Sequence, residues 1–117
     1  MASSRYSKVS KKWRGEVRRQ LKAQHVWTMS RENTVLRIIT RESGGSETAR
    51  NGSCVGLLQF NNGWKHNYSK AYFNKKHIKG AYHKDARLSG SWSIRRIARV
   101  YRIGGSAAVR SHWIATI

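Results

Sequence analysis

The sequence predicts a mainly α-helical fold with at most a small β element in its middle. Apolar residues recur at helical spacing in several segments, and glycine pairs or polar loops separate those segments. The 117 residues contain no proline and can enclose a single modest core. We therefore expect a flexible basic arm over residues 1–12, which hold few apolar side chains, and a single domain over residues 13–117.

The first predicted element is an amphipathic helix over about residues 14–25. Its apolar side follows Trp13 and includes Val17 and Leu21, which are spaced by about one helical turn. Basic residues occupy the other faces. This pattern is typical of a helix that packs one side against a core.

A second helix is predicted over about residues 31–42. Ser30 is a favoured N-cap residue, and Glu32 lies in the first turn, where a carboxylate is stabilised by the helix dipole. Gly44 and Gly45 follow the last apolar position and are expected to end the helix.

The middle of the chain predicts less regular structure. Residues 46–53 have the composition of a loop, and the apolar stretch "CVGLLQF" at 54–60 is either a short strand or a buried turn. A helix is expected within residues 63–74, and residues 79–90 are expected to be irregular.

The clearest helical pattern follows Ser91. Gly104 and Gly105 are expected to end this helix, and Ser106 can cap a last short helix, "AAVRSHW". One face of the longer helix carries the apolar or aromatic residues Ile94, Ile97, Ala98 and Tyr101.

The net charge of +19, from 24 Lys and Arg against 5 Asp and Glu, predicts salt-sensitive attraction to a polyanion. Nucleic acid, an anionic membrane surface and anionic cell-wall polymers all fit this charge. No apolar run approaches the ~18 residues of a membrane span, and the N-terminus lacks the apolar segment of a signal peptide.

Neither a disulfide nor a metal site is expected. Cys54 is the single cysteine and so has no internal partner. The histidines lack the close spacing of metal ligands, and we expect no cofactor; they are His25, His66, His77, His83 and His112.

Glu42 is the acid whose position is hardest to explain by stability alone. At ~100° per residue it falls in the apolar stripe of the second predicted helix, close to Val35, Ile38 and Ile39. Desolvation and the helix C-terminus both disfavour a carboxylate and raise its pKa, as a general acid requires. This holds only if desolvation outweighs the surrounding positive charge. The alternative is a frayed helix end with Glu42 in water.

Three motifs carry a resemblance to a known superfamily. "ESGG" begins at Glu42, "GLLQF" follows about fourteen residues later with Trp64 after it, and "IARVYRIGGSAAVRSHW" lies near the end. Together they resemble the goose-type lysozyme and soluble lytic transglycosylase (SLT) superfamily, most closely the lysozyme-like domains of phage tail and tape-measure proteins. One departure is Arg102, where the family often has asparagine after the tyrosine.

The resemblance implies a lysozyme-like α+β fold with a small or vestigial β element beside a groove. It also implies that Glu42 is the proton donor, that Ser43 and Gln59 bind the sugar or its N-acetyl group, and that Tyr101 positions Glu42 or the substrate. The structural alternatives are a helix-end residue for Ser43 and a loop amide for Gln59. Phe60 and Trp64 would support the groove, or belong to the core.

The implied reaction is cleavage of the MurNAc–GlcNAc β-1,4 bond of peptidoglycan, and two versions stay open. A hydrolytic lysozyme needs a second carboxylate, for which Glu47 and Asp85 are the candidates, because Glu16 and Glu32 lie on charged faces or in first turns. A lytic transglycosylase needs none, because the muramyl 6-hydroxyl attacks and Glu42 acts as acid and then base. The scarcity of acids favours the transglycosylase.

Other function classes remain. A nucleic-acid-binding module of low specificity would use lysines and arginines interleaved with aromatic residues. The aromatic residues are Trp13, Trp27, Trp64, Tyr68, Tyr72 and Tyr82. An inactive glycan-binding domain is disfavoured because Glu42, Ser43 and Gln59 are all present. We expect a monomer that acts at the bacterial cell wall on glycan strands and anionic wall polymers, carried there in a phage virion, by lysis or by a secretion machine.

Overall fold

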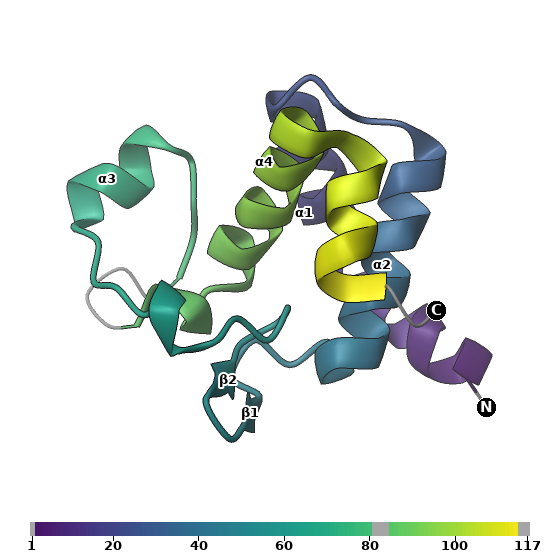
Figure 1. Cartoon of the computed structure of the whole chain (residues 1–117), viewed down its shortest axis with the longest axis horizontal. Helices are drawn as coiled ribbons and strands as arrows, with labels where there is room; N and C mark the ends of the chain where they lie inside the picture. Colours follow the sequence, from purple (N-terminus) through teal and green to yellow (C-terminus); the bar gives the residue numbers. More distant parts are fainter. Residues whose placement is uncertain (1, 81–84, 115–117) are drawn as a thin grey trace.

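A computed structural model describes residues 2–80 and 85–114 of the chain and is mainly helical with a small antiparallel sheet, as the sequence predicts (Figure 1). The helix α4 runs through the middle, with α1 behind it, α2 on one side and α3 on the other. The elements are α1 (Ala2–Ala23), α2 (Met29–Ser43), β1 (Arg50–Asn51), β2 (Cys54–Val55), the 3₁₀ turns η1 (Asn62–Trp64) and η2 (Ala86–Leu88), α3 (Lys70–Lys75), α4 (Gly90–Val109) and the π-helical turn η3 (Arg110–Ile114).

The segment expected as a flexible arm is instead the first half of α1, so the predicted helix bounds of 14–25 are wrong. Val9 is buried, and Tyr6 donates a hydrogen bond to Asn33 Oδ1 on α2 at 3.3 Å. The physical reason is that Tyr6, Val9 and Trp13 extend the apolar stripe upstream at helical spacing. A sparse stripe among polar residues is therefore enough to dock this helix.

Glu32 joins α1 to α2. Its carboxylate is fully buried and accepts hydrogen bonds from Arg14, from Arg18 at 2.6 and 2.9 Å, and from the Trp27 indole at 2.8 Å. The hydrogen bonds from Arg18, Trp27 and Arg14 outweigh the desolvation of the carboxyl and lower its pKa to about 2. Glu32 therefore compensates two cations of α1 at the helix interface, rather than lying on a solvated first turn.

The ends of α2 follow capping chemistry. Thr28, in extended backbone, accepts a hydrogen bond from the Arg31 N–H at 3.0 Å, so Thr28 and not Ser30 is the N-cap. Gly44 has φ 62°, and its N–H donates to the Thr40 carbonyl at 3.1 Å. The predicted stop at Gly44 is confirmed, because glycine adopts this left-handed conformation at little cost.

The "CVGLLQF" stretch is both a strand and a buried turn. It begins in β2, and its chain then curls back so that the Val55 N–H donates to the Phe60 carbonyl at 3.0 Å. Gly56 has φ 94°, and a Cβ there would lie 1.9 Å from the Arg87 carbonyl oxygen. The buried Arg87 side chain donates to the carbonyls of Ser53 and Phe60, each at 2.9 Å. These contacts fix residues 49–60, which we call the central loop, against η2.

The helix expected within residues 63–74 is divided into the turn η1 and the short helix α3. Ser69 caps α3 by accepting from the Tyr72 N–H at 3.0 Å. Of the region expected to be irregular, residues 81–84 lie outside the described residues, and 86–88 form η2.

The helix α4 begins at Gly90, slightly before the start that was predicted after Ser91, and Ser89 is its N-cap. The predicted stop at the glycine pair is confirmed: Gly105 has φ 68° and ψ −167°, which is not helical, and a second stretch of helical backbone begins directly afterwards within α4. In Figure 1 the segment after this kink (yellow) folds back in front, between α4 and α2. The Trp113 indole there donates to the Leu58 carbonyl at 3.1 Å, so the last turn closes over the central loop.

Replacing Gly105 by alanine should destabilise the fold by about 1–3 kcal/mol, because this backbone conformation is open essentially only to glycine. A methyl group added at this position would meet no atom within 4 Å, so backbone strain alone sets the cost. The matched control is Gly15→Ala in α1, which also meets no atom and should stabilise by about 0.5–1 kcal/mol. Urea unfolding of both variants checks this; equal stabilities would contradict the assigned reversal.

Candidate active site and aromatic cleft

Glu42 occupies the last turn of α2, two residues before the left-handed Gly44. Its side chain is half-buried, and this burial raises its pKa, against the opposing charge of Arg41. In the ranges 2–80 and 85–114, no hydrogen bond or ion pair joins the Glu42 carboxyl group to another residue. Desolvation therefore outweighs the neighbouring positive charge, and the net increase in the Glu42 pKa is the direction that the acid hypothesis requires.

The two candidate second carboxylates are held in structural contacts. Glu47 Oε1 accepts from the Gly90 N–H at 2.8 Å, where the dipole of α4 favours a negative charge. Asp85 forms an ion pair with Arg87 at 2.6 Å and accepts from the Arg87 backbone N–H. Its burial raises the pKa, but the bonds from Arg87 lower it further, with a net decrease. Neither is a free base in this arrangement.

Glu16 is structural as well. It binds Arg19 on the same helix and accepts from the hydroxyl of Ser91 at the start of α4. Desolvation of the carboxyl would raise its pKa, but the hydrogen bonds to it lower the pKa overall. With Glu32 already engaged, four of the five acidic side chains stabilise the fold.

Ser43 lies beside Glu42, but its hydroxyl serves the helix end. It donates to the Ile39 carbonyl and accepts from the Gly45 N–H, both at 3.2 Å. The carbonyl of Gly45 in turn accepts from the Trp13 indole at 2.9 Å. These contacts correspond to the structural alternative for Ser43 and fix the chain directly after Glu42.

Gln59 holds the central loop together. Its amide donates to the carbonyls of Ala49 at 3.2 Å and Gly56 at 2.9 Å, and its oxygen accepts from Asn51 at 3.0 Å. Its φ of 55° shows that the backbone is turned at this residue. Gln59 also lines a cavity, so it is a loop amide that faces a potential ligand site.

Tyr101 is buried against the middle of α2 rather than its end. Its hydroxyl is hydrogen-bonded to Thr34, and the Arg31 guanidinium lies 4.9 Å from its ring centroid. Burial raises the pKa of the phenol. Since Thr34 precedes Glu42 by two helical turns, roughly 12 Å of helix, the contacts of Tyr101 are with the middle of α2.

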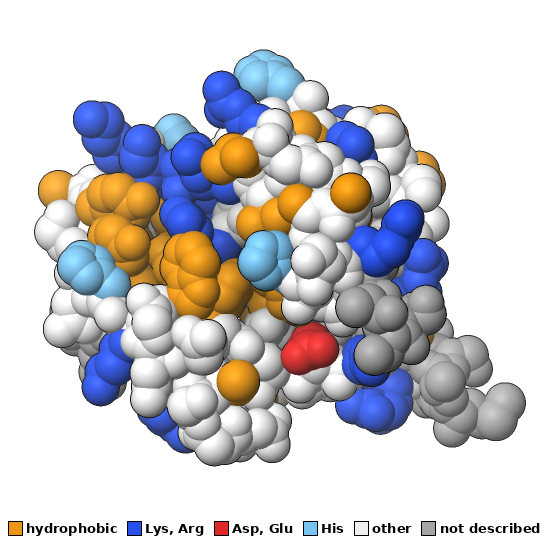
Figure 2. Space-filling view, viewed as in Figure 1, with side chains coloured by type: hydrophobic (Ala, Val, Ile, Leu, Met, Phe, Trp, Pro, Cys, Tyr) orange, Lys and Arg blue, Asp and Glu red, His pale blue; other side chains and the backbone are white. Residues whose placement is uncertain are grey.

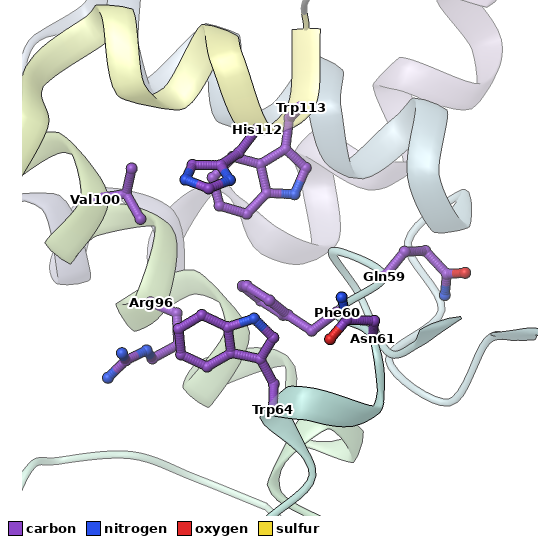
Figure 3. A pocket seen from close by; sticks show the side chains of 8 residues that line it. All are labelled: Gln59, Phe60, Asn61, Trp64, Arg96, Val100, His112 and Trp113. Carbon is purple, nitrogen blue, oxygen red and sulfur yellow. The ribbon is translucent and has the colours of Figure 1, made fainter. Parts of the chain in front are cut away.

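A cleft of about 170 Å³ lies beside the central loop (Figure 3). The ring of Phe60 packs between Trp64 and Trp113, with centroid distances of 5.4 and 5.7 Å, and Trp64 remains 41% exposed. Figure 2 shows hydrophobic side chains bordered by basic ones around a hollow. The cleft is lined by Gln59, Phe60, Asn61, Trp64, Arg96, Val100, His112 and Trp113.

Of the residues that the sequence singles out, this cleft unites Gln59, Phe60 and Trp64, whereas Glu42 is not among its lining residues. His112 and Trp113 form the "HW" of the sequence resemblance, but the sequence gives no sign that they enter a cleft. They do so because Gly105 turns the chain back toward the central loop.

Comparisons with protein-family models, curated protein sequences and solved structures gave no match to the chain. Across residues 2–80 and 85–114, no helix combines the length and the apolar character needed to cross a membrane. In the same residues, no group of three His, Cys, Asp or Glu side chains is placed to hold a metal ion.

Glu42→Gln should raise the stability of the protein at neutral pH. A carboxyl whose pKa is raised by folding stabilises the folded state below its unfolded pKa of about 4.5, and this contribution is lost as pH rises through the folded value. The neutral amide avoids that loss. Thermal unfolding should therefore give a higher Tm for the variant at about pH 7 and no difference near pH 3.

Glu32→Gln is the matched control, because its expected change in Tm at neutral pH has the opposite sign. The lowered pKa of Glu32 contributes stability above about pH 4.5, which is lost as pH falls through about 2. This variant should melt lower than the parent at neutral pH. If Glu42→Gln were also destabilising at neutral pH, the desolvated state assigned to Glu42 would be wrong.

Proposed function

We propose that the protein is a lytic transglycosylase that cleaves the MurNAc–GlcNAc β-1,4 bond of peptidoglycan, with Glu42 as the proton donor. The observation that carries the proposal is the state of Glu42: a half-buried carboxyl with a raised pKa and no ion pair within the described chain, in a protein of 24 Lys and Arg. A raised pKa keeps a larger share of the acid protonated near neutral pH. The "ESGG" and "GLLQF" motifs support the same assignment.

In this reaction the Glu42 carboxyl gives its proton to the glycosidic oxygen as the bond from that oxygen to C1 of the muramyl residue breaks. The muramyl 6-hydroxyl bonds to C1, and the Glu42 carboxylate takes its proton. The products are a 1,6-anhydromuramyl end and a free 4-hydroxyl, and Glu42 returns to its protonated form. No water and no second carboxylate take part, which suits a protein whose other acids hold structural contacts.

The cleft beside the central loop provides the surface for a glycan in this proposal. Trp64 offers a partly exposed apolar surface, the nearly buried Phe60 forms part of the wall, and Gln59 lines the same site. Apolar walls with a few polar groups are typical of ligand sites. Ser43 and Tyr101 would contribute by fixing the end and the middle of α2 around Glu42, rather than by free hydroxyl groups.

Hydrolysis by a lysozyme mechanism is the nearest alternative. It would need Glu47 or Asp85 as the second carboxylate. Glu47 is the less constrained of the two, because it accepts a single backbone hydrogen bond, whereas Asp85 is paired with the buried Arg87. Glu47 is therefore the residue to test against the transglycosylase.

A basic nucleic-acid-binding module is the candidate from another class. Arg96 lies 4.8 Å from the ring centroid of the exposed Trp64, an arrangement that can stack a base and bind a phosphate. On the enzyme proposal, the same net charge of +19 attracts anionic wall polymers instead. We infer a monomer that reaches the wall through a virion, through lysis or through a secretion machine.

The test is digestion of purified peptidoglycan followed by mass spectrometry of the soluble products. The parent should release fragments with 1,6-anhydromuramyl ends, and Glu42→Gln should lower the rate by at least about 10²-fold, the contribution of general acid catalysis. Glu47→Gln is the matched control, because its amide oxygen can still accept from Gly90, and it should retain activity.

Three outcomes would contradict the proposal. Full activity of Glu42→Gln would remove the acid assignment. Reducing ends, together with loss of activity in Glu47→Gln, would favour hydrolysis. No release of fragments from the wall, with tight and salt-sensitive binding to DNA, would favour the nucleic-acid module.

A further inference from the structure

We propose that Arg96 is a specificity-determining residue that binds a carboxylate of the peptide stem of peptidoglycan beside the aromatic cleft. This inference rests on the proposed function for the identity of the ligand. The geometry on which it depends is independent of catalysis. A guanidinium without an ion pair to any described residue lines a cleft, with two aromatic rings beneath it and two further arginines next to it.

Arg96 is held by aromatic rings and not by an acid. Its guanidinium carbon lies 4.8 Å from the centroid of Trp64 and 5.9 Å from that of Trp92. Figure 3 shows the side chain running beside the Trp64 ring at the edge of the cleft. Contact with a ring uses the face of a guanidinium, whereas its N–H donors lie in the plane and remain able to form a fork with a carboxylate.

No acidic side chain neutralises Arg96. All five Asp and Glu residues lie in the described part of the chain, and none of them pairs with Arg96. Glu16, Glu32 and Asp85 pair with other arginines, Glu47 caps α4, and Glu42 forms no ion pair with a described residue. Within the same residues the Arg96 guanidinium makes no hydrogen bond, although the side chain is half-buried. A partly desolvated cation without an anion is costly, and a bound oxyanion would relieve that cost.

Two neighbouring arginines on α4 add positive charge beside Arg96, which favours the binding of an anion there. Burial is the largest cause that lowers the pKa of Arg96, and the charges of Arg99 and Arg95 lower it further, against the opposing effect of Tyr68. Arg95 is itself only 8% exposed and makes no ion pair with a described residue. A cation in a cleft whose pKa is lowered by burial and by like charges is a candidate for a functional role.

The chemistry of the site selects a ligand with both a sugar or apolar surface and an oxyanion. The partly exposed Trp64 offers an apolar ring surface to the first part, and Arg96 offers paired donors to the second. A muropeptide, in which a disaccharide carries an acidic peptide, combines these features in one molecule. Phosphate groups of wall polymers share the oxyanion chemistry but not the attached peptide.

The experiment measures binding by isothermal titration calorimetry in a Glu42→Gln background, so that no cleavage occurs. The probes are a soluble disaccharide-tetrapeptide, the same molecule with its carboxyl groups amidated, and a glycerol phosphate oligomer. The acidic muropeptide should bind about tenfold more tightly than the amidated one. Arg96→Gln should abolish this difference, and Arg96→Lys, which keeps the charge but not the fork, should retain only part of it.

Arg102→Gln is the matched control for lost charge, because Arg102 lies on α4 but is exposed and binds Gln24 on α1. It should leave the preference for the acidic muropeptide unchanged. Circular dichroism melting checks that each variant is folded.

Equal binding of the acidic and amidated muropeptides, or equal losses in Arg96→Gln and Arg102→Gln, would overturn the inference. So would a dependence on Arg96 that appears only with the glycerol phosphate oligomer. A preference that depends on Arg96 in a protein that cleaves no wall would overturn the proposed function alone; cleavage without this preference would overturn the role of Arg96 alone.

Discussion

The buried carboxylate of Glu32 is the contact on which the helical frame depends. It lies between α2 and the strongly basic α1, where it compensates Arg14 and Arg18 and accepts the Trp27 indole N–H. Without this anion, the cations of α1 would face α2 with no compensating charge at the interface. The contact thereby fixes the helix whose last turn carries Glu42.

The chain has few acidic residues, and Glu42 differs from the other four in its contacts. In a chain of net charge +19, each carboxylate has many cations available, and Glu16, Glu32 and Asp85 are bound by arginines while Glu47 caps a helix. Glu42 departs from this pattern, because burial outweighs the charge of Arg41. On the proposed function, this departure reflects the role of Glu42 as the acid of the reaction.

Sequence periodicity predicted the main helices, the end of α2 at Gly44 and the place of Glu42 in the apolar stripe, because these depend on local spacing and capping; the frayed end with Glu42 in water stayed open until the structure showed the side chain half-buried. It failed for residues 2–12, where a weak stripe gains a partner only through tertiary contact with α2. It also gave no sign of Arg87, whose bonds to the central loop join residues distant in sequence.

The aromatic cleft was the least predictable part for a related reason. Gly105 has the sequence pattern of a helix stop, and only its φ and ψ values reveal a reversal that carries Trp113 back to Leu58. The partners of Arg96 likewise come from segments that no local pattern connects. Helix spacing and capping therefore predict where Glu42 lies on α2, whereas the surface that would present a ligand depends on contacts between distant segments.

The central claim is that folding makes Glu42 hold its proton more tightly than an ordinary carboxyl group. The most direct measurement is an NMR titration of the ¹³C-labelled side-chain carboxyl groups, with Glu42→Gln used to assign the Glu42 signal. We predict a Glu42 pKa above 4.5, and above those of Glu16, Glu32 and Asp85, which are lowered. A Glu42 pKa at or below 4.5 would contradict this claim.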